Sequence, residues 1–287
     1  MQTADGAIIA CTTRGRKTGI ACGDQVDITP AKGHQGVVEC ITPRSSLLYR
    51  SDPFREKLFA ANVTQVVIVI ASVPSYNEDI LNAALLAAEA ADIRVLIVLN
   101  KADMAPETTR ALAEMEIYRS LGYELLVMSA LQDVSVLRAR LMQNTSVLLG
   151  ESGMGKSTLL NALLPHAKAR TGEFSTALDS GKHTTTATQM YHLDAESRLI
   201  DSPGFQEFGL FHLSDTDISY SMPEFRPLLG QCRFSNCRHM QEPGCAITQS
   251  HSVSQRRLRF YQNLIAKHDA LRAMNPPQAV KNNEKKS

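Results

Sequence analysis

A glycine-rich loop, Gly150-Glu-Ser-Gly-Met-Gly-Lys-Ser157, constrains the fold of this chain more than any other segment. It follows an apolar run at 146–149 and precedes a helical pattern at 156–164. This spacing between a strand and a helix is the Walker A pattern, in which backbone N–H groups and a helix N-terminus surround phosphate groups. Lys156 adds a cation, and Ser157 offers its hydroxyl to Mg²⁺. The residues expected to bind the phosphates are Gly150, Glu151, Ser152, Gly153, Met154, Gly155, Lys156, Ser157 and Thr158.

Strand and helix patterns alternate along the central part of the chain. Buried strands are predicted at 63–71, 93–99, 124–129, 146–149 and 198–200, with helices at 80–91, 106–121 and 156–164. Such an alternation indicates an α/β domain with a mostly parallel sheet.

The tetrapeptide Asn100-Lys101-Ala-Asp103 follows one of these strands and indicates which base is bound. Guanine has two adjacent N–H donors that the Asp103 carboxylate can accept together, while Asn100 can stabilise the loop. Adenine would leave that carboxylate unpaired at a cost. Ser129-Ala130 follows the next strand and fits a loop whose backbone N–H meets the guanine oxygen.

Two segments after the Walker loop predict the rest of a magnesium site. Asp201-Ser-Pro-Gly204 supplies a carboxylate for the magnesium shell and, at Gly204, an N–H for the terminal phosphate. In the Gly181-Lys-His-Thr-Thr-Thr186 segment, Thr185 is the favoured magnesium ligand and Thr184 a close second. A solvated Ser/Thr loop is the alternative interpretation, because a threonine triplet alone carries little information.

The order of these motifs is rotated relative to common GTPases, where the phosphate loop comes first. Here the guanine motifs at 100–103 and 129–130 precede the phosphate loop and Asp201. We therefore predict a circularly permuted GTPase domain, since domain termini lie close together often enough for permutation to be tolerated.

A second constellation, Cys232-x4-Cys237-x-His239-x5-Cys245, follows the central domain. Three thiolates and one imidazole are the ligands that a closed, structural zinc site uses. Buried thiols beside an unrelated histidine are the alternative. Arginines in and after this segment could form an RNA-facing patch or an ordinary solvated face. They are Arg226, Arg233, Arg238, Arg256, Arg257 and Arg259.

The bulk composition excludes some classes of protein. The 287 residues carry 30 basic and 29 acidic side chains, so a nucleic-acid surface must be local. No apolar run approaches the roughly 20 residues that span a bilayer, and no secretory signal is apparent, which predicts a cytoplasmic protein with no membrane partner. The isolated Cys11, Cys22 and Cys40 are expected to be ordinary reduced residues.

We predict a multidomain chain with three parts. Short β-prone pieces in 1–52 suggest a small OB-like β-barrel that is short for a complete five-stranded one. Residues 53–218 are the permuted P-loop GTPase domain, and 219–287 are a zinc-binding domain with a helix near 252–273 and a disordered tail.

At this point the chain resembles the family of ribosome small-subunit-dependent GTPase A, circularly permuted GTPases of bacteria. The resemblance rests on the guanine, phosphate and Asp201 motifs, on 181–186, and on the zinc ligands with Glu242-Pro-Gly-Cys245. It implies an OB barrel, a GTPase and a zinc domain, binding of GTP or GDP with Mg²⁺ and one Zn²⁺, and hydrolysis stimulated by the 30S subunit. The implied role is late 30S maturation with binding to 16S rRNA. We expect a monomer.

The catalytic set is predicted to be Lys156, Thr185 and His183. Phe205 stands where many GTPases place a water-orienting glutamine, so intrinsic hydrolysis should be slow. His183 is a candidate for that role, or merely a switch-loop residue. The competing hypotheses are a nucleotide-responsive RNA-binding module with little turnover, and a permuted GTPase that serves the large subunit or RNA modification.

Overall fold

The computed structural model describes residues 1–3, 6–13, 19–52, 55–164, 188–201, 208 and 210–274. The chain forms two compact units, Met1–Leu210 and Phe211–Ser287, which are described in turn. Among the described residues, no helix combines the length and the apolar character that a membrane span requires.

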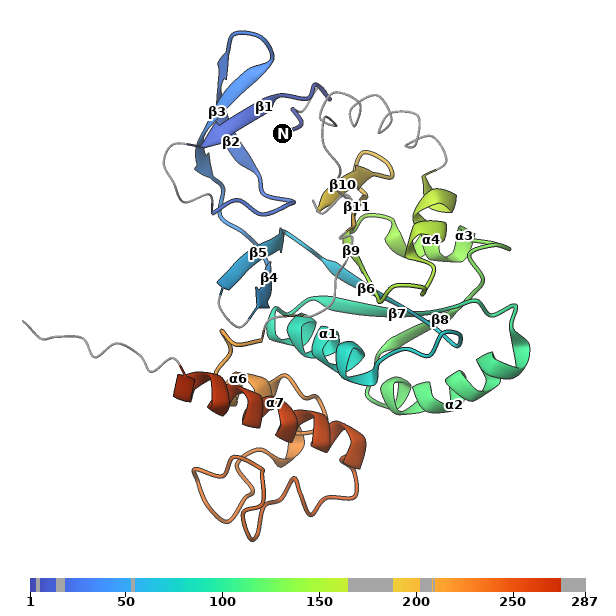
Figure 1. The fold of residues 1–287 in the computed structure, drawn as a ribbon, viewed down its shortest axis with the longest axis vertical. Helices are drawn as coiled ribbons and strands as arrows, with labels where there is room; N and C mark the ends of the chain where they lie inside the picture. Colours follow the sequence, from blue (N-terminus) through green and yellow to red (C-terminus); the bar gives the residue numbers. More distant parts are fainter. Residues whose placement is uncertain are drawn as a thin grey trace, which may run out of the picture. The chain divides into compact units, whose positions relative to one another are not determined.

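The N-terminal part of the first unit consists of short strands in two small sheets (Figure 1). Strands β1 (Ala10–Thr13), β2 (Val26–Ala31) and β3 (Gln35–Ile41) form the first sheet in the order β1-β3-β2. Strands β4 (Leu47–Asp52) and β5 (Arg55–Ala61) form an antiparallel hairpin, and one bridge joins Cys22 to Ala60. This arrangement is consistent with the predicted OB-like part. The β4–β5 hairpin was not anticipated from the sequence.

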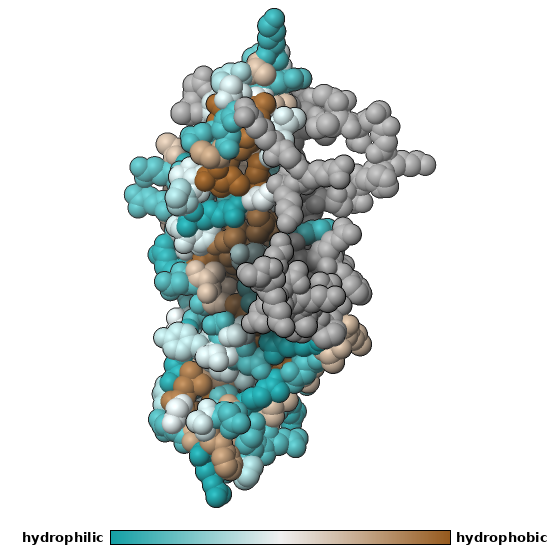
Figure 2. Space-filling view, turned by 90° about the vertical axis from the view of Figure 1, so that its left-hand side faces the viewer, coloured by the Kyte–Doolittle hydropathy of each residue, from teal (hydrophilic) through white to brown (hydrophobic). Residues whose placement is uncertain are grey.

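Val38, Leu48 and Phe59 of this part are buried, but other apolar side chains are only partly covered. Ile8 is 55% exposed, and Val26 and Ile28 on β2 are half-buried. In the upper part of Figure 2, brown apolar residues gather around these strands. Short strands give this part a thin core.

The centre of the first unit is a six-stranded sheet in the order β10-β11-β9-β6-β7-β8. The strands are β6 (Gln65–Ala71), β7 (Arg94–Asn100), β8 (Glu124–Val127), β9 (Thr145–Leu149), β10 (Gln189–His192) and β11 (Arg198–Asp201). Five run parallel, and only the edge strand β10 is antiparallel to its neighbour. Every residue of β6 is buried, which explains its unbroken apolar sequence. The predicted α/β domain with a mostly parallel sheet is confirmed.

Helices cover both faces of this sheet. The helices are α1 (Glu78–Ala90), α2 (Ala105–Ser120), α3 (Ser135–Leu141) and α4 (Lys156–Leu163). Leu137 and Leu141 of α3 and Leu159 of α4 share a core with Val67 and Val69 of β6. Helix α1 packs on β6 and β7, and strand alternation assigns it to the opposite face.

The strand order explains why the permuted sequence still builds one site. Strand β9, which leads into the phosphate loop, lies between β11 and β6. The loops that follow β6, β7, β8, β9 and β11 leave the sheet at the same edge, because these strands are parallel. The guanine motifs and the phosphate loop therefore meet although their order in the chain is rotated.

The second unit has little regular structure besides one long helix. It contains α6 (Asp215–Tyr220), a 3₁₀ turn η1 (Arg226–Leu228) and α7 (Gln255–Met274). Ser214 and Asp217 form a capping box that starts α6. Arg257 of α7 is 1% exposed and donates to both carboxylate oxygens of Glu224. This ion pair fastens α7 to the segment that precedes the cysteines.

Arg257→Met should destabilise the protein by about 3 kcal/mol, because it leaves the buried Glu224 carboxylate without its partner. The measurement is urea unfolding of the zinc-loaded protein followed by circular dichroism. The double variant Glu224→Leu/Arg257→Met should regain most of the loss, and Arg259→Met, at an exposed position of the same helix, should change it by under about 0.5 kcal/mol. An Arg257→Met variant as stable as the parent would contradict this.

Candidate functional site

The Asn100 side chain joins the two nucleotide-binding regions predicted from the sequence. It is 1% exposed and lies at the carboxyl end of β7. Its Nδ2 donates to the carbonyl of Met154 in the phosphate loop at 2.9 Å, and its Oδ1 accepts the N–H of Ala130 at 2.9 Å. One buried amide therefore fixes the phosphate loop and the Ser129-Ala130 loop to each other.

Two glycines of the phosphate loop are required by close contacts. Gly150 has φ +147°, and a Cβ there would lie 2.3 Å from the carbonyl oxygen of Val69. Gly155 has φ +92°, and a Cβ there would lie 2.3 Å from Nδ2 of Asn100. The loop can pass over β6 and contact Asn100 only because these positions lack a side chain.

Lys156 is the first residue of α4, and its ammonium points back over the loop. It donates to the carbonyl of Gly150 and, at 2.8 Å, to the carbonyl of Glu151. Burial lowers the pKa of Lys156, and the negative charges of Asp201 and Glu151 oppose that shift. Asp201 ends β11, the neighbour of β9, so the predicted cation and the predicted magnesium carboxylate are close enough to interact.

Asp103 lies exposed after β7, with Ser129 close by. The pKa of Asp103 is held below its usual value, first by a hydrogen bond from the Ser129 side chain. A hydrogen bond from the backbone of Asp103 itself and the charge of Lys101 act in the same direction. The Lys101 ammonium donates to the carbonyl of Val73 at 2.7 Å. Asp103 is thus an ionised acceptor at the rim, as recognition of a base with two N–H donors requires.

Sequence reasoning missed one contact of the phosphate loop. The Glu151 carboxylate accepts the backbone N–H of Asn77 at 2.6 Å, and Asn77 is the N-cap of α1. A carboxylate at a helix N-terminus is favourable, so this bond ties the phosphate loop to α1. Nothing in the local sequence around 151 pairs it with a residue 74 positions earlier.

The remaining predicted residues fall into two groups. Ser152 and Gly153 lie in the loop, and Ser157 and Thr158 lie in the first turn of α4. His183, Thr185 and Gly204 lie outside the described residues, as do Thr184 and Phe205.

The four predicted zinc ligands converge in the second unit. The Nδ1 atom of His239 lies 3.5 Å from Sγ of Cys232, 3.6 Å from Sγ of Cys237 and 3.4 Å from Sγ of Cys245. The Sγ atoms of Cys232 and Cys245 are 3.9 Å apart. Ordinary Zn–S and Zn–N bond lengths in a tetrahedron give edges of about 3.6 Å for S···N and about 3.8 Å for S···S. The donor set and its spacing both fit one Zn²⁺.

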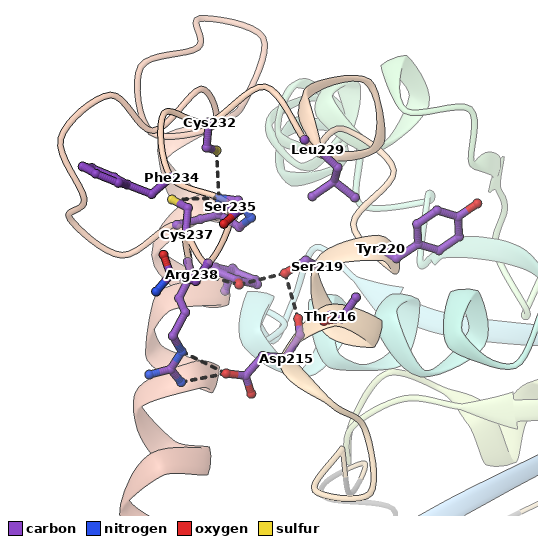
Figure 3. A pocket seen from close by; sticks show the side chains of 14 residues that line it. Asp215, Thr216, Ser219, Tyr220, Leu229, Cys232, Phe234, Ser235, Cys237 and Arg238 are labelled. Atoms are coloured by element: carbon purple, nitrogen blue, oxygen red, sulfur yellow. Dashed lines mark hydrogen bonds and ion pairs between the residues drawn. The ribbon is translucent and has the colours of Figure 1, made fainter.

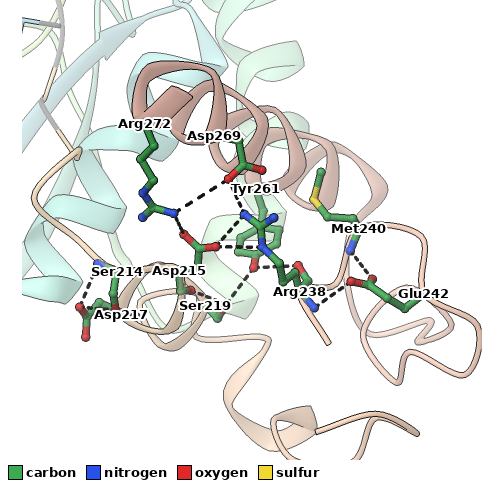
Figure 4. A network of polar contacts seen from close by, with 10 residues as sticks. All are labelled: Ser214, Asp215, Asp217, Ser219, Arg238, Met240, Glu242, Tyr261, Asp269 and Arg272. Carbon is green, nitrogen blue, oxygen red and sulfur yellow. Dashed lines mark hydrogen bonds and ion pairs between the residues drawn. The ribbon is translucent and has the colours of Figure 1, made fainter. Parts of the chain in front are cut away.

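The Glu242 carboxylate holds the backbone of the loop that carries these ligands (Figure 4). Glu242 accepts the backbone N–H of Arg238 at 2.9 Å and of Met240 at 2.8 Å. From α7, Gln262 donates to the carbonyl of His239 at 3.1 Å, and the Tyr261 hydroxyl donates to the carbonyl of Arg238 at 3.1 Å. The backbone around His239 is therefore held from two sides, which fixes the imidazole for the metal.

The arginines of this unit do not all face solvent, which corrects part of the predicted patch. Arg238 pairs with Asp215 at 2.7 Å and Asp269 at 2.8 Å, as Figure 4 shows. Arg272 adds a contact to Asp215 at 2.9 Å. Buried Arg257 cannot face RNA, and two carboxylates largely neutralise Arg238. The ion pairs of Arg238 and Arg272 with Asp215 and Asp269 join α6, the zinc loop and α7.

Comparison with known proteins identifies the family of the chain. Residues 41–211 match the RsgA GTPase family. A protein of Nitrosospira multiformis named small ribosomal subunit biogenesis GTPase RsgA is 52% identical over 269 residues, which cover 93% of this chain and 86% of that protein. The chain belongs to the RsgA GTPase family. A protein of the same name from Neisseria gonorrhoeae is 51% identical over 92% of this chain and 87% of its own length.

Solved structures of similar proteins support the same assignment. YjeQ from Thermotoga maritima matches with a TM-score of 0.69 and 27% identity over 92% of this chain and 91% of that one. YloQ, described as a circularly permuted GTPase, matches with a TM-score of 0.65 and 26% identity over 95% and 89%. The predicted permuted GTPase fold is confirmed. As a member of this family the chain is a GTP hydrolase that uses GTP or GDP with Mg²⁺, and its Cys₃His cluster fits one zinc ion.

Asn100→Ala should lower the free energy of unfolding by about 2–4 kcal/mol, because it leaves the Ala130 N–H and the Met154 carbonyl buried without partners. Affinity for a fluorescent guanine nucleotide should fall with it. Urea denaturation and nucleotide titration measure the two effects. Thr109→Ala, at an exposed position of α2, is the control and should leave both within error. Unchanged nucleotide affinity in Asn100→Ala would refute the linking role of this amide.

Zinc should be present at one equivalent, and its removal by a chelator should unfold the loop of 232–245, which contains no helix or strand. Metal analysis and hydrogen exchange over 211–274 test this. Cys245→Ser should lose the metal, whereas Cys40→Ser, at an exposed cysteine outside the cluster, should keep it. Zinc binding retained in Cys245→Ser would show that this thiol is not a ligand.

Proposed function

We propose that this chain is a GTPase that acts in late assembly of the small ribosomal subunit, where it binds 16S rRNA and hydrolyses GTP in response to the 30S particle. The observation that carries the nucleotide part is the Asn100 amide, which joins the guanine-side loops to the phosphate loop. The ribosomal part is supported by relatives named small ribosomal subunit biogenesis GTPase.

The proposed nucleotide site assigns a separate task to each motif. Asp103 accepts two N–H groups of guanine, and the Ala130 N–H, which Asn100 holds in place, is assigned to the guanine oxygen. Lys156 exchanges its two loop carbonyls for phosphate oxygens. Ser157, Thr185 and Asp201 are the proposed residues around Mg²⁺, which when bound neutralises charge on the phosphates.

The proposed catalytic step depends on a segment outside the described residues. His183 is assigned to orient the attacking water, because Phe205 cannot do so by hydrogen bonding. Slow intrinsic hydrolysis is expected, with His183 taking this role when the 30S particle is bound. Lys156 and Thr185 stabilise charge in the transition state.

The proposed cellular setting follows from the same assignment. We place the protein in the cytoplasm as a monomer, with residues 1–52, 53–218 and 219–287 as its OB-like, GTPase and zinc-binding domains. The OB-like and zinc-binding parts are the proposed contacts to rRNA. Hydrolysis loosens the segment after Asp201 and so releases the particle.

Single-turnover GTP hydrolysis with and without purified small subunits tests the function. We expect a large increase with small subunits and none with separated large subunits. Cosedimentation with a non-hydrolysable GTP analogue should favour the small subunit. A rate that no subunit changes, together with RNA affinity that depends on the nucleotide, would instead support the RNA-binding module with little turnover.

Asp103→Asn should lower GTP affinity about a hundredfold, because an amide cannot accept both guanine N–H groups as a carboxylate does. Affinity for xanthosine triphosphate should rise, since its C2 carbonyl can accept from the new amide. Competition titration with the two nucleotides measures this. Asp133→Asn, also at an exposed carboxylate, is the matched control. Equal GTP affinity in Asp103→Asn and the parent would remove Asp103 from the base site.

A further inference from the structure

A pocket of about 380 Å³ lies beside the zinc cluster, between α6 and the loop that carries Cys232 and Cys237. Its volume is at the lower end of the range for small-ligand sites. Figure 3 shows Tyr220 and Phe234 at opposite sides of it, with Ser235 and Arg238 between them. Cys232, Cys237 and His239 line the pocket and belong to the metal site. Metal binding does not require the exposed rings of Tyr220 and Phe234.

An arginine guanidinium lies over each of the Tyr220 and Phe234 rings. The guanidinium of Arg226 lies over the Tyr220 ring, 5.1 Å from its centre, and the guanidinium of Arg233 lies over the Phe234 ring, 5.4 Å from its centre. Tyr220 is 62% exposed and Phe234 is 41% exposed. An exposed aromatic face beside a cation is suited to stacking a base and holding its phosphate.

One of these arginine–aromatic pairs, Arg233 and Phe234, lies between two zinc ligands and is exposed to solvent. The four residues between Cys232 and Cys237 are Arg233, Phe234, Ser235 and Asn236, and all four are exposed. The Ser235 hydroxyl and the Asn236 amide line the pocket and offer both donors and acceptors. Such groups can read the edge of a base that has left a helix, which a duplex would keep covered.

The charge of the unit favours an anionic occupant. Between Phe211 and Met274 there are eight Lys and Arg residues and five Asp and Glu residues, although the whole chain is nearly balanced. A Zn²⁺ with three thiolates removes only about one positive charge from that excess. Arg226 and Arg233 lie over the two exposed rings and are themselves exposed, which places them to meet phosphate; Arg226 also donates to the carbonyl of Tyr220 at 2.8 Å.

We propose that this pocket binds two successive unstacked nucleotides of a single-stranded or looped-out RNA segment, with one base on the Phe234 ring and the next on the Tyr220 ring. Arg233 and Arg226 contact the flanking phosphates. The proposal rests on the proposed binding to rRNA and adds the mode of recognition. A double helix is excluded as the occupant, because its bases are stacked on each other and cannot enter the pocket.

The test uses the full-length, zinc-loaded protein and a short fluorescein-labelled RNA without self-complementarity, free or annealed to its complement. Phe234→Leu and Tyr220→Leu keep an apolar side chain but remove the ring, and each should weaken binding of the single strand about tenfold. Phe234→Tyr and Tyr220→Phe keep the ring and should bind like the parent. Arg226→Ala/Arg233→Ala should reduce the slope of log affinity against log salt by about 1.4.

Arg110→Ala is the charge control, at a side chain of α2 that is 86% exposed. Zinc content of each variant confirms that the cluster is intact. Single-strand binding that Phe234→Leu and Tyr220→Leu leave unchanged would overturn the proposal, and so would equal affinity for the duplex. Loss of small-subunit binding without loss of RNA binding would also overturn it, because the pocket would then hold a protein segment.

Failure of the pocket is separable from failure of the proposed function. Stimulation of GTP hydrolysis by small subunits is measured on the same parent protein. If the parent is stimulated but the leucine variants bind RNA normally, only the pocket assignment is wrong. If the parent is not stimulated, the ribosomal function itself is wrong, whatever the oligonucleotide binding shows.

Discussion

The nucleotide-binding part of this protein depends on one buried amide. Asn100 spends its donor on the phosphate loop and its acceptor on the loop after β8, so neither loop can move without breaking a hydrogen bond inside the protein. The same contact requires a glycine at position 155. Circular permutation leaves this geometry intact, because it changes the order in which strands are connected and not the edge at which their loops meet.

The second unit is held together by a different set of interactions. Its apolar core, which includes Met222, Phe225 and Ile265, is supplemented by polar contacts that hold its irregular segments. The Cys₃His cluster, the carboxylate of Glu242 and the Asp215–Arg238–Asp269 ion pairs each join parts of the chain that regular secondary structure does not. As a result Arg257 is buried, and the partly exposed Arg238 and Arg272 are paired with carboxylates. What remains exposed beside the metal is therefore a small, specific set of side chains.

Much of this architecture could be predicted from the sequence, for identifiable reasons. Buried parallel strands have continuous apolar runs, so β6 and β7 were located to within two residues, and metal ligands have characteristic spacing. The hairpin of β4 and β5 was missed because its residues lack a clear alternation. Arg257 was misjudged because a charge in sequence carries no sign of its partner, and Glu224 is 33 residues away. The Glu151 contact to Asn77 was invisible for the same reason.

The bonds of Lys156 also hold the phosphate loop in shape. Its ammonium bridges the carbonyls of Gly150 and Glu151, six and five residues earlier in the chain. The first turn of α4 is thereby tied to the start of the loop. A substitution at position 156 therefore changes the conformation of the loop as well as its charge.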